Sequence, residues 1–181
     1  MKKIIFILAL LLSGISLTSC SDDEWGNDNP MMEHIYYYGL GNVKYPGGNE
    51  LKYTVKQGNT LEIPTYFFSA FIRNYNPEVW YYTTSDDLTL GVDYIVVDED
   101  GNAINPVHDG GYLMVWPNAK QGIQNVRIQA LSGKKGTLRV LTQNPSVTMK
   151  SDNVASTIIV STSEYEVRAF TENYYVTINV N

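Results

Sequence analysis

The sequence contains few of the residues that catalysis most often uses. It has one cysteine, Cys20, and two histidines, His34 and His108, among 181 residues. A single cysteine cannot form an internal disulfide. His108 is followed by Asp109, and the two could serve as base and orienter, but no serine motif accompanies them. No motif singles out a pair of carboxylates for glycoside hydrolysis either. We therefore expect no enzymatic activity.

Basic residues are also few, and they are scattered. The chain has 13 Lys and Arg against 19 Asp and Glu, for a formal net charge of -6. Beyond the N-terminus only Lys134 and Lys135 are adjacent, and glycines flank them. Nucleic-acid binding requires a basic stripe or patch. We therefore expect no nucleic-acid partner.

The N-terminal apolar run, Ile4–Leu12, is too short to span a bilayer, which takes about 20 apolar residues. It follows Met1-Lys2-Lys3 and precedes Leu17-Thr18-Ser19-Cys20. A short positive region, an apolar core and small residues are typical of a cleaved secretory signal. The last four residues resemble the lipobox of bacterial lipoproteins, in which the cysteine is lipidated. This resemblance implies a signal at 1–19 and a lipid anchor at Cys20; an ordinary signal peptide with an accidental cysteine is the alternative.

An acidic cluster, Ser21–Glu24, comes directly after Cys20. It resembles the export tag that sends lipoproteins of Bacteroidota to the outer face of the outer membrane; its alternative is a solvated acidic spacer. We interpret residues 20–34 as a flexible tether and 35–181 as one domain, of ordinary size for a single core. The expected location is the outer membrane, facing the cell exterior.

Strand patterns dominate the chain after the tether, and no stretch keeps the spacing of an amphipathic helix. Runs of alternating or β-branched and aromatic residues are separated by Gly, Asn, Asp and Pro. The last run, Tyr175–Val180, places Val176, Ile178 and Val180 on one face. Such short strands predict an all-β, antiparallel sandwich or barrel. The candidate strands are 51–55, 61–68, 79–83, 94–97, 112–116, 126–130, 137–141, 157–160, 165–169 and 175–180.

The middle of the chain runs from Val79 through an acidic turn to Gly91-Val92-Asp93-Tyr94, and continues through Leu113–Pro117, Gly122 and Val126–Ile128. This order of residues resembles the Calx-β type of immunoglobulin-like repeat. It covers about a third of the chain. The resemblance implies an antiparallel immunoglobulin-like β-sandwich and carries little functional information, because one fold hosts many functions.

Calx-β repeats can bind calcium, and Asp86 and Asp87 stand where part of that acidic cluster would lie. Lys134 and Lys135 replace the acidic run expected elsewhere in the site, whereas a hard cation needs several oxygen ligands. The stretch Asp98–Asn102 resembles the start of a calcium loop but lacks the glutamate of an EF-hand. We interpret both acidic clusters as structural turns and expect neither metal nor cofactor.

Aromatic residues are abundant, with 14 Tyr, 3 Trp and 5 Phe. Several are consecutive, as in Trp80-Tyr81-Tyr82, and consecutive strand residues point to opposite faces. Exposed Tyr and Trp are typical of recognition surfaces, although tyrosine is also simply a good strand residue. The ligand-binding residues that we predict are Trp80, Tyr82 and Trp116.

Two classes of function fit these features. The first is a binding lipoprotein that resembles the accessory subunits of SusCD-like, TonB-dependent importers in Bacteroidota. It would capture a glycan or peptide nutrient, or pack on the SusC-like and SusD-like proteins. The second is a structural or adhesive surface protein with no link to nutrient import.

Overall fold

The structure is a computed structural model that describes residues 33–43, 49–131 and 133–181. The predicted signal at 1–19 and the predicted lipidation site Cys20 lie outside the described residues, as does the predicted tether up to residue 32. The last two tether residues, Glu33 and His34, belong to the same compact unit as the rest of the described chain, Glu33–Asn181.

The described residues form strands and short 3-10 turns, with no α-helix among them. No helix in the described ranges is long and apolar enough to cross a membrane. The prediction of an all-β fold is therefore confirmed. The strands are β1 (Ile35–Leu40), β2 (Asn42–Val43), β3 (Asn49–Glu50), β4 (Lys52–Val55), β5 (Thr60–Phe68), β6 (Glu78–Thr84), β7 (Tyr94–Val97), β8 (Tyr112–Val115), β9 (Gly122–Ala130), β10 (Gly136–Leu141), β11 (Ile158–Ser161), β12 (Glu166–Ala169) and β13 (Tyr175–Val180). The 3-10 turns are η3 (Pro117–Ala119) and η4 (Val154–Thr157).

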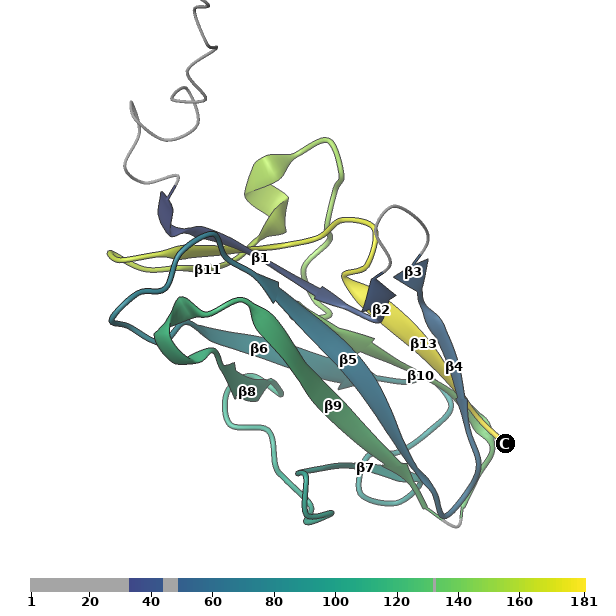
Figure 1. Ribbon diagram of the computed structural model, residues 1–181. Coiled ribbons are helices and arrows are strands. Elements are labelled where there is room, and N and C mark those ends of the chain that lie inside the picture. Colours follow the sequence, from purple (N-terminus) through teal and green to yellow (C-terminus); the bar gives the residue numbers. More distant parts are fainter. Residues whose placement is uncertain (1–32, 44–48, 132) are drawn as a thin grey trace, which may run out of the picture. The chain divides into compact units, whose positions relative to one another are not determined.

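These strands form two main sheets and a small β2-β3 ribbon. One sheet has six strands in the order β11-β12-β1-β5-β9-β7, and the other has five in the order β4-β13-β10-β6-β8. Figure 1 shows β5 and β9 side by side across the front of the domain, with β6 and β10 behind them.

Most strand pairs are antiparallel, but β1 pairs with β12, and β4 with β13, in parallel. The prediction of antiparallel pairing throughout is therefore wrong at these two ladders. Both join an early strand to a strand near the C-terminus. No hairpin turn relates such distant strands, so nothing local in the sequence determines their direction.

Alternation along the strands builds the core. In β13, Val176, Ile178 and Val180 are buried, as predicted, whereas the residues between them are exposed or half-buried. Both main sheets contribute to one cluster of buried side chains. The largest fully buried members are Tyr36, Tyr38, Tyr112, Phe67, Leu40 and Ile63.

A proline lies inside β5, a central strand, where a missing N–H would normally break the ladder. The Pro64 carbonyl accepts a hydrogen bond from Gly41 N–H at 2.9 Å, so this residue presents its backbone groups to the side of β1. β1 has ended at Leu40, and the chain turns away at Gly41 with φ +85°. A Cβ at Gly41 would lie 2.3 Å from the Glu50 carbonyl oxygen, so only glycine fits this turn.

Candidate functional site

Strand β6 places its aromatic side chains on both faces. Val79 and Tyr81 point into the core, whereas Trp80 and Tyr82 lie on the opposite face of the strand. Trp80 is half-buried, and Tyr82 is 8% exposed. The structure therefore brings together two of the three predicted recognition residues.

Trp80 and Tyr82 line a pocket of about 120 Å³. The loop after β10 and the start of β11 complete it, so both main sheets contribute to its lining. Ligand pockets that enclose a drug-sized molecule measure roughly 300–1,000 Å³. This pocket therefore suits one ring-sized group of a larger ligand. The remaining lining residues are Thr142, Gln143, Asn144, Val147, Ile158 and Ile159.

The loop after β10 is braced by its own hydrogen bonds. The Asn144 carbonyl accepts from Val147 N–H at 2.9 Å. The Asn144 Oδ1 accepts from the Ser146 N–H at 2.9 Å and from the Ser146 hydroxyl at 2.7 Å. Such Asx-type bonds stabilise a turn without help from a sheet. The loop therefore presents its side chains to the pocket in a preorganised arrangement.

Gln143 supplies a polar group without a partner. Its side-chain Nε2 donates to the Val147 carbonyl at 3.0 Å, which fixes the orientation of the amide. Its Oε1 is buried and accepts no hydrogen bond from the described residues, and the whole residue is only 6% exposed. Most buried polar atoms in native proteins have a partner. Gln143, a pocket-lining residue, therefore has one acceptor that the described residues leave unused.

The loop that contains His108 and Asp109 lies next to β6. The Trp80 and His108 rings are 5.9 Å apart, and His108 Nε2 lies 3.3 Å from Asp109 Oδ2. The structure thus joins this predicted base and orienter, but both side chains are about two-thirds exposed. Neither lines the pocket, and no lining residue is His, Cys, Lys, Asp or Glu. The described lining residues are therefore uncharged aromatic, amide, hydroxyl and aliphatic side chains.

Gly111, at the end of the same loop, packs directly on Tyr82. A Cβ at Gly111 would lie 2.9 Å from the Tyr82 ring, so a larger residue would have to displace that ring. Burial raises the pKa of the Tyr82 hydroxyl, and the negative charge of Asp109 raises it further. Tyr82 therefore stays a neutral hydroxyl at physiological pH.

Trp116 is placed differently from Trp80. It is 2% exposed, and its ring stacks on Phe67 with centroids 5.0 Å apart. The expectation of an exposed Trp116 is wrong, because Tyr112, Met114 and Trp116 share the inward face of β8 and its continuation. The same alternation, read from the sequence, could have placed it inside. Its indole N–H is buried without an acceptor among the described residues.

The acidic clusters form turns. Asp86 and Asp87 are exposed, and the Lys134 ammonium donates to the Asp87 carbonyl at 2.9 Å. The Asp98 carboxylate accepts from the N–H groups of Asp100 and Asn102, at 3.0 and 2.8 Å. Within the described residues, no three His, Cys, Asp or Glu side chains are grouped so as to hold a metal ion.

Asp93, in the segment that resembles Calx-β, also has a structural position. Its carboxylate accepts from the N–H groups of Thr89 and Lys134, at 2.8 and 3.1 Å. These two hydrogen bonds, with the positive charge of Lys134, lower the pKa of the Asp93 carboxyl. The carboxylate thereby ties the turn before β7 to the turn before β10.

The residues that complete the pocket were absent from the sequence-based prediction. Asn144-Pro145 is a turn signal, and it marks a loop at this point of the chain. Nothing in it indicates that the loop folds against β6. The lining residues Gln143, Val147 and Ile158 could therefore be recognised only once the sheets were paired.

A second group of aromatic rings lies on the outer face of the six-stranded sheet. Tyr37 alternates with the buried Tyr36 and Tyr38, so this tyrosine run has an outward member, as expected. The Tyr37 ring lies 5.3 Å from Phe170, and Phe170 lies 5.1 Å from Phe68. The three rings therefore pack against one another. None of them belongs to the lining of the pocket.

Comparisons with known proteins identify no family. No family model and no curated protein matches the chain. Among solved structures, the chain is similar to AvmM, which catalyzes macrocyclization in alchivemycin A biosynthesis. The match has 11% identity and a TM-score of 0.35, and it covers 82% of this chain and 89% of the other. A likeness at this TM-score carries no argument about function.

Proposed function

We propose that this protein is a non-catalytic cell-surface lipoprotein that recognises a ligand with the pocket of Trp80 and Tyr82. One observation carries the proposal: two aromatic side chains share a pocket with Gln143, whose buried Oε1 has no partner among the described residues, and none of the described lining residues is charged. Aromatic faces and a few placed polar groups are the usual components of a small-ligand site.

The scaffold in this proposal is an immunoglobulin-like β-sandwich. Two features support it: the buried cluster draws on both main sheets, and the segment from β6 to β9 resembles the Calx-β repeat. The pocket then lies between the outward face of β6, the loop after β10 and the start of β11. Rigid strands hold Trp80 and Tyr82, while a loop supplies the polar group, an arrangement common to binding domains.

The proposed setting is the outer membrane, where Cys20 would carry the lipid anchor and the acidic cluster Ser21–Glu24 would direct export. There the protein serves a SusCD-like importer, either by capturing a glycan or peptide nutrient or by packing as an accessory subunit. The short stretch between Cys20 and Glu33 favours partners in the same membrane, because it reaches only some tens of ångströms.

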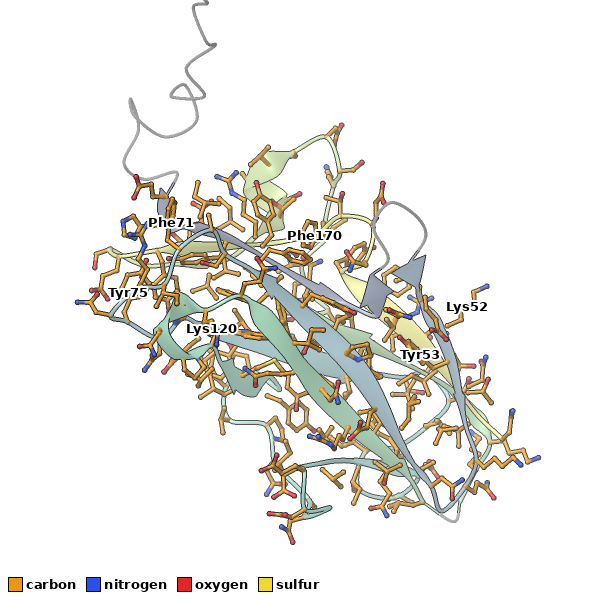
Figure 2. The ribbon with its side chains drawn as sticks, in the orientation of Figure 1. Lys52, Tyr53, Phe71, Tyr75, Lys120 and Phe170 are labelled. Carbon is orange, nitrogen blue, oxygen red and sulfur yellow. The ribbon has the colours of Figure 1, made fainter. Side chains whose placement is uncertain are left out.

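The test is ligand binding by the detergent-solubilised, full-length protein on arrays of glycans and of peptides. We expect wild-type binding and its loss in Trp80→Ala. Phe71→Ala is the matched control, since Phe71 is an exposed aromatic on the segment after β5 and lines no part of the pocket. Figure 2 shows where this control residue lies: Phe71 is at one end of the domain, near Tyr75, and Lys52 and Tyr53 on β4 are at the other end. Equal binding by Trp80→Ala and Phe71→Ala would refute the assignment of the site.

The competing proposal is a structural or adhesive surface protein. Purification from the membranes of its host in mild detergent separates the two, since an importer subunit should bring SusC-like and SusD-like proteins with it. Recovery of a monomer that also binds no array ligand would favour the adhesive role.

A further inference from the structure

We infer that the pocket takes a single pyranose ring of a glycan, stacked on Trp80, with a ring hydroxyl donating to Gln143 Oε1. The inference rests on the proposed function and names the ligand class of the same site. It follows from the hydrogen-bonding capacity, the charge and the size of the lining.

The hydrogen-bonding capacity of Gln143 calls for a ligand group that donates a hydrogen bond. Gln143 Nε2 is engaged by the Val147 carbonyl, so the amide cannot turn over without placing two carbonyl oxygens together. The remaining group is Oε1, which is buried and has no partner in the described part of the chain. A ligand group that ends in a carbonyl, carboxylate or phosphate oxygen would leave it unsatisfied, whereas a hydroxyl or an N–H satisfies it.

The charge of the lining narrows the choice further. None of the eight lining residues carries a charge. A lysine, an arginine or a sugar acid would lose hydration there without gaining an ion pair. A neutral group with several hydroxyls therefore fits better than a charged one.

Size and shape then favour a sugar ring. At about 120 Å³ the pocket admits one ring-sized group. A pyranose has an apolar face of C–H groups and a rim of hydroxyls, which matches an aromatic wall at Trp80 beside an amide at Gln143. A single ring in so small a site is held weakly, with a Kd in about the millimolar range. Several such copies on one membrane would bind a polymer more tightly.

A peptide is the competing occupant. It would pair with the outer edge of β11, which is the end strand of the six-stranded sheet and contributes Ile158 and Ile159 to the lining. That mode relies on backbone hydrogen bonds to β11 and needs neither the Trp80 face nor the Gln143 acceptor. The two occupants therefore differ in which substitutions abolish binding.

The experiment titrates the full-length protein in detergent with the methyl pyranosides of glucose, galactose and mannose, with their monodeoxy analogues, and with N-acetyl tripeptide amides. We expect at least one pyranoside to bind, and Trp80→Ala to weaken it tenfold or more. Gln143→Leu should weaken it about tenfold, the effect of one hydrogen bond. The analogue that lacks the bonded hydroxyl should bind wild type more weakly and should bind Gln143→Leu no worse than the parent sugar.

The monodeoxy analogues separate the acceptor from the loop brace, because each removes only a ligand hydroxyl, whereas Gln143→Leu also removes the donor to Val147. Weaker binding of one analogue to wild type, but not to Gln143→Leu, supports the acceptor role. Equal loss on both proteins, or no loss on wild type, overturns it and leaves Gln143 as a loop brace. Trp80-dependent binding of the tripeptides without any pyranoside overturns the inference and leaves the proposed function standing. If no probe and no array ligand binds, both fail.

Discussion

Replacing Trp116 by alanine tests whether this residue holds the core together. At 2% exposure the side chain buries nearly all of its surface, and a large aromatic buries about 150–250 Å². At about 25 cal/mol per Å² this corresponds to roughly 4–6 kcal/mol, which is an upper estimate. Truncations of buried Phe or Trp cost about 3–5 kcal/mol. We therefore expect Trp116→Ala to lower the free energy of unfolding by about 4 kcal/mol and Tm by roughly 8–16 °C.

Trp116→Phe refines this test. Phenylalanine keeps a ring on Phe67 and removes an indole N–H that is buried without an acceptor, so it should cost less than half as much as alanine. Urea unfolding followed by circular dichroism measures both, with Trp80→Ala as the surface comparison, for which we expect a loss of about 1 kcal/mol. If Trp116→Ala unfolds within 1 kcal/mol of wild type but loses ligand binding, the core assignment of Trp116 is incorrect.

Three more predictions concern the anchor, the pocket and acid stability. Cys20→Ser should abolish labelling by radioactive palmitate and release the protein from membranes; retention of label would disprove the anchor. Gly111→Ala should cost about 1–3 kcal/mol in urea unfolding, because its Cβ displaces the Tyr82 ring, and should weaken ligand binding. The Asp93 carboxyl has a lowered pKa in the folded state, so its stabilisation is present above its unfolded pKa and is lost as pH falls through the folded value. Wild type should therefore lose stability below about pH 4 more steeply than Asp93→Asn, and parallel pH profiles would contradict this reasoning.

The positions of most strands were predictable because alternation is a local property, but β1 (Ile35–Leu40) was not among the predicted strands. The run Val79–Thr83 corresponds to β6, and Tyr94–Val97 matches β7. Alternation also predicts which face of a strand such as β8 is buried, provided that it is continued past the last residue of the strand. Trp116 follows the alternation of Tyr112 and is buried, so counting by two from a buried tyrosine is a better guide than residue type alone.

Strand direction and the full pocket were not predictable in this way. Nothing near β1 specifies that it runs parallel to β12, because the pairing joins segments more than a hundred residues apart. Gln143 gives no sign of a functional role in the sequence. Its buried acceptor arises from a loop bond to Val147 and from the cover supplied by neighbouring elements.

The sequence by itself determined the all-β character and the apolar face of strands such as β13, because both depend on the period of two along the chain. It also placed Trp80 and Tyr82 together on one face of β6. Only the tertiary structure decided that Gln143 and Ile158 join them. The physical reason is that a pocket is made of contacts between distant segments, and these exist only after the sheets have paired and packed.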